Sequence, residues 1–147
     1  MATPFSDALL AALHHLAAFT LVSVLLAEWF MTAQPDPTER DLAQLRRLDL
    51  LYGLMAVLVL AGGVARLVWG AQAWSYYAAS PAFWAKMVCF AVVGALSVKP
   101  TLLLLATRAP AADGHADTLR RVRHWISAEL CAIPLLLLFA SLMARGF

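Results

Sequence analysis

Charged side chains are scarce in this chain. Only 14% of its 147 residues are Asp, Glu, Lys or Arg, whereas 63% are hydrophobic, and the mean hydropathy is +0.76. Soluble domains carry about 25% charged residues. The composition therefore excludes an ordinary soluble domain and indicates an integral membrane protein.

Cysteine is also rare, and the common catalytic and metal-binding motifs are missing. The two cysteines, Cys89 and Cys131, lie in apolar runs and are expected to be small packing residues rather than a disulfide framework. No CxxC, CxxCH, HExxH, GxGxxG or P-loop pattern occurs, which excludes the usual zinc, c-type haem and nucleotide motifs. The basic residues are few, divided between segments and mixed with acids, so we expect no nucleic-acid partner.

Four long apolar runs make up most of the chain, over residues 8–32, 48–70, 81–107 and 118–144. Each run exceeds the roughly 20 residues that a helix needs to cross a bilayer, whose interior tolerates no unpaired backbone. The first run is too long for a signal peptide and follows a segment without Lys or Arg, so it is expected to stay in the membrane. We predict an all-α, antiparallel four-helix bundle that forms one transmembrane domain over residues 1–147.

The positions of the arginines predict the orientation of the bundle. They are concentrated in two of the segments that join the apolar runs, as Arg40, Arg46 and Arg47 in the first and Arg108, Arg120, Arg121 and Arg123 in the other. The N-terminal tail and the segment between the second and third runs have none. By the positive-inside rule, both basic segments are cytoplasmic and both termini are periplasmic in a bacterial inner membrane.

Ionisable residues inside the apolar runs are costly in a membrane and are usually functional. When they are sorted by depth at ~1.5 Å per residue, they form two layers. The periplasmic layer contains His14, His15, Arg66 and Lys86, and the cytoplasmic layer contains Glu28, Asp49, Lys99, His124 and Glu129. On an ideal helix His14 and Glu28 fall within roughly 40° of one face, whereas His15 points elsewhere. A small rotation of the helix would exchange the two histidines.

The periplasmic layer combines an imidazole with two cations. Haem b needs a histidine as axial iron ligand and basic side chains to pair with its propionates. We expect His14 to ligate the iron, with His15 as the alternative, and Arg66 and Lys86 to pair with the propionates. The second axial ligand could be Lys86, Met143 or none. The simpler interpretation is that these residues bind lipid phosphates or structural waters.

The cytoplasmic layer has two interpretations. Glu28, Asp49 and Glu129 lie near arginines in the predicted bundle, so an ion-pair network that fixes the helices is the simpler one. The other is a proton path in which Glu28 and Glu129 handle protons for redox chemistry.

Three stretches resemble known families. "ALHHLAAF", "RRLDLLYGLMAVLVLAGGVAR" and "YYAASPAFWAKMVCFAVVGALSVKPT" together resemble an uncharacterised family of small bacterial four-helix membrane proteins. The chain more distantly resembles HemJ-type protoporphyrinogen oxidases and the CopD-type membrane domain, through the "ALH" ending at His14 and the "WAK" ending at Lys86. This second resemblance implies that His14 ligates haem b and that Lys86 is essential.

We therefore expect a membrane haem b protein with a redox or electron-transfer role, which uses quinol or a porphyrinogen as electron donor. The alternative is a non-catalytic subunit of a homo-oligomer or larger membrane complex, which small-residue stripes such as Gly62 with Gly63 would favour. A third and weaker interpretation is a small transporter or metal-handling protein that uses the acidic layer.

Overall fold

The computed structural model describes residues 3–35, 37–107 and 115–146, and these residues are almost wholly helical. They form five helices, which are α1 (Pro4–Met31), α2 (Glu39–Trp69), α3 (Trp74–Ala78), α4 (Pro81–Ala106) and α5 (Ala116–Ala144). Helices α1, α2, α4 and α5 are each long and apolar enough to cross a membrane. The predicted all-α bundle of four spans is confirmed.

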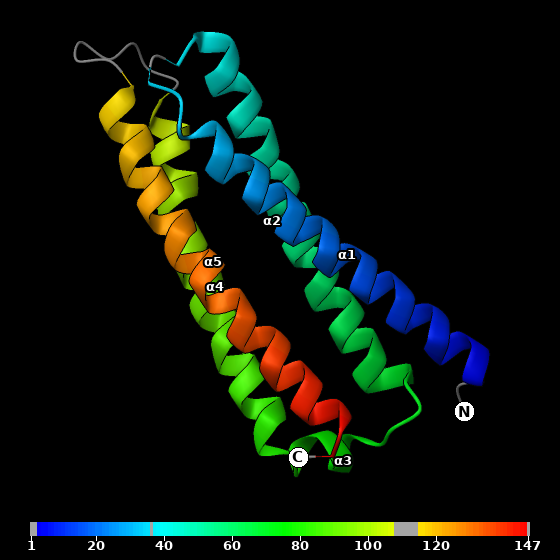
Figure 1. Ribbon diagram of the computed structural model, residues 1–147. Helices are drawn as coiled ribbons and strands as arrows, with labels where there is room; N and C mark the ends of the chain where they lie inside the picture. The colour runs from blue at the N-terminus through cyan, green and yellow to red at the C-terminus, as the bar shows by residue number, and fades with distance from the viewer. Residues whose placement is uncertain (1–2, 36, 108–114, 147) are drawn as a thin grey trace.

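The four long helices are arranged as two antiparallel hairpins (Figure 1). Helices α1 and α2 pack along each other, as do α4 and α5, and the hairpins meet where α1 contacts α5 and α2 contacts α4. We call the end where α2 and α5 begin the arginine end, because Arg46, Arg120 and Arg123 lie there, and the opposite end the α3 end. Helix α1 begins and α5 finishes at the α3 end (Figure 1). Which end faces the cytoplasm stays a prediction, and Arg108 lies outside the described residues.

Helices α1 and α2 begin several residues earlier than the apolar runs indicated. Helix α1 begins at Pro4 because the Thr3 hydroxyl accepts a hydrogen bond from the Ser6 amide. Helix α2 begins at Glu39, not near residue 48, because Thr38 and Asp41 form a capping box in which each side chain accepts from the other's backbone amide. Its first turns are polar on one side, so a search for apolar runs misses them.

The segment between α2 and α4 is not a simple turn. It contains α3, and Tyr77 from α3 is buried with its ring centroid 5.8 Å from that of Phe83 in α4. The Ser80 hydroxyl accepts a hydrogen bond from the Phe83 amide at the start of α4. Short as it is, α3 therefore packs against the beginning of the second hairpin.

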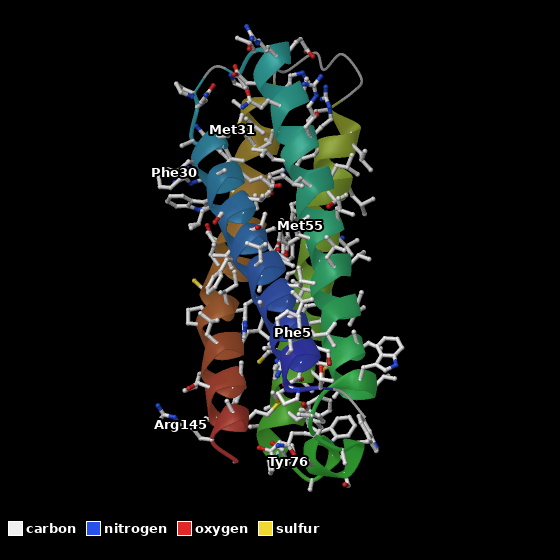
Figure 2. The ribbon with its side chains drawn as sticks, turned by 90° about the vertical axis from the view of Figure 1, so that its right-hand side faces the viewer. Phe5, Phe30, Met31, Met55, Tyr76 and Arg145 are labelled. Atoms are coloured by element: carbon white, nitrogen blue, oxygen red, sulfur yellow. The ribbon has the colours of Figure 1, made fainter. Side chains whose placement is uncertain are left out.

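The buried core lies mainly in the half of the bundle toward the arginine end. Its members are Val24, Leu25, Leu42, Leu45, Tyr52, Leu104, Leu119, Val122, Ile126 and Ile133. Many other large apolar side chains are exposed, such as Phe30, which is 66% exposed and points away from the helices (Figure 2). In a membrane these side chains contact lipid. Cys131 is also exposed, so the expectation that both cysteines are packing residues is wrong for Cys131.

Hydrogen bonds between the hairpins lie near the arginine end. The Trp29 indole Nε1 donates to the Ser127 Oγ over 2.9 Å. Arg123 donates to the Trp29 carbonyl oxygen, and its guanidinium lies 3.9 Å from the centroid of the Trp29 ring. Arg46 donates to the Thr107 Oγ1 over 3.0 Å. These polar contacts fix α1 against α5 and α2 against α4.

Within the first hairpin, α1 and α2 approach closely at Gly62. A Cβ atom added to Gly62 would lie 3.3 Å from the Cβ and 3.5 Å from the Cα of His14. A Cβ atom added to Gly63 would lie 3.6 Å from the His14 Cε1, which is an ordinary contact distance. Gly62 therefore permits the close contact of the two helices, whereas Gly63 is not required for it.

Replacing Ser127 with alanine removes the acceptor of the Trp29 indole. We expect Ser127→Ala to lower the free energy of unfolding by roughly 0.5–1.5 kcal/mol, the usual range for hydrogen bonds between membrane helices. Circular dichroism during unfolding by sodium dodecyl sulfate in mixed micelles would measure it. Ser23→Ala is the matched control, because the exposed Ser23 hydroxyl donates only to the Phe19 carbonyl of its own helix. Equal losses in the two variants would contradict the assignment.

Replacing Gly62 and Gly63 separately tests the close approach of α1 and α2. We expect Gly62→Ala to have a free energy of unfolding about 1–2 kcal/mol lower than that of Gly63→Ala, because the added methyl group must displace His14 by a few tenths of an ångström. Gly63→Ala should be neutral or slightly stabilising, since alanine favours helices more than glycine does. The same unfolding measurement applies. A Gly62→Ala variant as stable as Gly63→Ala would show that the helices are not in close contact there.

Candidate functional site

Three of the predicted site residues come together toward the α3 end, one from each of three helices. His14 belongs to α1, Arg66 to the last turn of α2 and Lys86 to the second turn of α4. His14 interacts electrostatically with Lys86 and Arg66, and Lys86 also interacts with Arg66. All three side chains are half-buried. We call these three residues the basic layer.

The imidazole of His14 packs against the backbone of α2. Its Nδ1 lies 3.2 Å from the position that a Cβ atom of Gly62 would occupy. The ring interacts with the backbone of Val59, although the buried Nδ1 makes no hydrogen bond of standard geometry. His15, in contrast, is exposed. The prediction that His14 and His15 lie on different faces of the helix is confirmed. The role of either residue as an iron ligand stays a prediction.

The two cations of the basic layer have no carboxylate partner among residues 3–35, 37–107 and 115–146. The ion pairs within these ranges are Arg121 with Asp117 at 3.0 Å and His115 with Glu39 at 3.5 Å, both toward the arginine end. The Nε of Arg66 is buried without a hydrogen-bond partner. The basic layer therefore carries uncompensated positive charge, which suits an anionic ligand.

Met143 lies near the end of α5. Its side chain is half-buried, and its carbonyl oxygen accepts a hydrogen bond of 3.3 Å from the Tyr76 hydroxyl of α3. Its proposed role as a second axial ligand stays a prediction. An apolar depression of about 490 Å³ between α4 and α5 is lined by Pro81, Ala82, Ala85, Phe139 and Leu142.

Three carboxyl groups form a second layer, in the half toward the arginine end. Glu28 and Glu129 are 1% and 0% exposed, and Asp49 is half-buried. Glu28 interacts electrostatically with both Asp49 and Glu129. The Tyr52 hydroxyl donates to the Glu129 Oε2 over 2.8 Å, and the Thr101 hydroxyl donates to the Asp49 Oδ1 over 2.8 Å. We call Glu28, Asp49 and Glu129 the acidic layer.

The predicted ion-pair network in this layer is wrong for the described part of the chain. No arginine or lysine there pairs with Glu28, Asp49 or Glu129. Arg46 and Arg123 bond to the Thr107 hydroxyl and the Trp29 carbonyl instead. Lys99 and His124, which were expected in this layer, are exposed. The two arginines thus have neutral acceptors, whereas Glu129 and Asp49 accept hydrogen bonds from hydroxyl groups.

Sequence reasoning also missed the two hydroxyl donors. Tyr52 follows Asp49 by one helical turn on α2, so this spacing could have indicated a shared face. Thr101 carries no comparable signal, because its partner Asp49 is on another helix.

The described residues contain no group of three or more His, Cys, Asp or Glu side chains placed to hold a metal ion. A metal centre made of protein ligands alone is thus not formed by this part of the chain. Haem iron differs, because the porphyrin supplies four of its ligands and the protein needs to supply only one or two.

Comparison with known protein families identifies a family for this chain. A family model described as "Predicted membrane protein (DUF2214)" matches residues 6–147. No curated protein and no solved structure matches the chain. The resemblance to HemJ-type oxidases and to the CopD-type domain therefore stays a prediction. Because the family model covers nearly the whole chain, and its description agrees with four spans, the protein belongs to the DUF2214 family of predicted membrane proteins, whose function is unknown.

Proposed function

We propose that this protein binds haem b in the membrane and has a redox or electron-transfer role. The observation that supports it most is the basic layer, in which Arg66 and Lys86 lie within electrostatic range of His14 and have no carboxylate partner in the described ranges. Haem b carries two carboxylates and an iron that takes an imidazole ligand. The basic layer therefore offers an imidazole for the iron of haem b and two cations for its carboxylates.

The setting of His14 suits an iron ligand. A histidine that binds a metal usually directs its other ring N–H to a carbonyl or carboxylate, which fixes the tautomer and the ring orientation. The backbone of Val59 interacts with the His14 ring, and Gly62 lets the ring lie against α2. With one ring nitrogen facing α2, the other is left to bind iron.

Arg66 and Lys86 would hold the propionates from two different helices. Charge-assisted hydrogen bonds from a guanidinium and an ammonium would orient the porphyrin between the hairpins. Lys86 is also the better supported candidate for a second iron ligand, because it lies within electrostatic range of His14, whereas no described interaction links Met143 to His14. Bound haem would supply one-electron chemistry, and the chain would set its position and local charge.

The electron donor would be quinol or a porphyrinogen. The apolar depression between α4 and α5 is lined in part by Ala82 and Ala85, which lie within one helical turn of Lys86. An apolar depression at this level of the bundle favours a donor with a lipophilic portion. With the orientation given by the positive-inside rule, the site would lie toward the periplasm of a bacterial inner membrane.

The accessory-subunit alternative loses one of its supports. Gly62, one of the small residues that would favour this alternative, packs against His14 inside the same hairpin. No other described feature indicates that the exposed apolar side chains contact a partner chain rather than lipid.

Absorption spectra of the purified protein, supplemented with haem and then separated from unbound haem by gel filtration, test the proposal. We expect a Soret band that stays with the protein and shifts on reduction with dithionite, as expected for haem iron ligated by an imidazole. His14→Ala should abolish the band, and His15→Ala should keep it, since His15 is exposed. Arg66→Gln and Lys86→Gln should each lower haem occupancy severalfold.

Arg145→Gln is the control for the two charge variants, because Arg145 is exposed beyond the last turn of α5 (Figure 2). It should bind haem like the parent protein. Absence of a Soret band after supplementation, or its loss in His15→Ala but not in His14→Ala, would refute the proposal.

A further inference from the structure

Glu28 is a buried carboxyl group without a hydrogen-bond donor in the described part of the chain. Its side chain is 1% exposed, and its Oε1 is buried without a hydrogen-bond partner. No described side chain donates a hydrogen bond to it, although it lies within electrostatic range of Asp49 and Glu129. Glu129 is 0% exposed, and its Oε1 is also unpartnered. Two buried carboxyls from α1 and α5 thus each present a free oxygen.

The groups around Glu28 can be assigned helix by helix. Helix α2 contributes Asp49 and the Tyr52 hydroxyl, and α5 contributes Glu129. Helix α4 contributes Thr101, whose hydroxyl donates to Asp49.

The nearby basic groups are directed elsewhere. Arg46 bonds to Thr107, and Arg123 bonds to Trp29. Lys99 on α4 and His124 on α5 are exposed. No described cation therefore compensates the acidic layer.

A carboxylate buried in a membrane without a cationic partner is so costly that the group takes up a neutralising ligand. Among the described residues, no three such ligands are placed to hold a metal ion. A proton needs only one oxygen, and a protonated carboxyl can donate to a neighbouring carboxylate. The geometry therefore favours a proton as the ligand.

We propose that Glu28 and Glu129 form a membrane-embedded proton-binding site that exchanges protons with water. A carboxylate oxygen takes a proton from hydronium and leaves water, and the reverse step releases it. Tyr52 holds Glu129 by its hydrogen bond and leaves the other Glu129 oxygen available. Glu28 is fourteen residues from His14, about 21 Å along α1, so this site is separate from the haem site and does not depend on it.

Labelling with dicyclohexylcarbodiimide tests the site, because this apolar reagent modifies protonated carboxyls in apolar surroundings. In the full chain in detergent at neutral pH, we expect one adduct by intact mass, mapped to Glu28 or Glu129 by peptide sequencing. The double variant Glu28→Gln, Glu129→Gln should label at least tenfold less. Asp117→Asn should label like the parent protein, because the side chain of Asp117 is 71% exposed and paired with Arg121.

Infrared spectra of the unmodified protein provide a second measurement that needs no variant. We expect the carbonyl band of a protonated carboxylic acid at neutral pH, which shifts after transfer to D₂O because the proton exchanges. A missing band, a band that does not shift, or labelling confined to Asp49 or to exposed acids such as Glu39 would overturn the proposal. These outcomes do not involve haem, so failure here and failure of haem binding are separate results.

Discussion

Inside a bilayer, a polar side chain must find its partner within the protein, and this constraint governs how the two hairpins meet. Lipid tails are as apolar as leucine, so burial alone gives the hairpins little reason to associate. Several described hydrogen bonds join the α1–α2 hairpin to the α4–α5 hairpin. Their donors and acceptors belong to Trp29, Ser127, Arg123, Arg46, Thr107, Tyr52, Glu129, Asp49 and Thr101. All of them lie in the half toward the arginine end. The same polar residues that would be costly in lipid therefore join the hairpins.

Joining the hairpins at one end has a consequence for the other. The core cluster lies beside the polar joints, whereas the hairpins are further apart toward the α3 end (Figure 1). Arg66 and Lys86 lie in this looser half, where they repel each other and no described carboxylate compensates them. An anionic ligand between the hairpins would remove that repulsion. It would also stabilise the folded bundle, because a ligand that binds only the folded state favours it.

The sequence predicted the features that depend on one helix at a time. Apolar runs located the four spans, and helical periodicity distinguished the half-buried His14 from the exposed His15. The start of α2 was predicted too late, because capping by Thr38 and Asp41 extends the helix through polar residues. The ion-pair network failed for a different reason. The position of a residue along its helix predicts its depth in the membrane. It does not predict whether Arg123 donates to a carboxylate or to the Trp29 carbonyl oxygen on another helix.

The basic layer and the acidic layer share α1, which raises the question of how strongly they affect each other. His14 and Glu28 are about 21 Å apart along the helix. Two unit charges at this distance interact by about 0.8 kcal/mol at an effective dielectric constant of about 20. A proton gained at Glu28 would thus change a charge equilibrium at His14 by less than about tenfold, since a tenfold change needs about 1.4 kcal/mol. Direct proton transfer over this distance is excluded, so a stronger coupling between the layers would need intermediate proton carriers or movement of the hairpins about their polar joints.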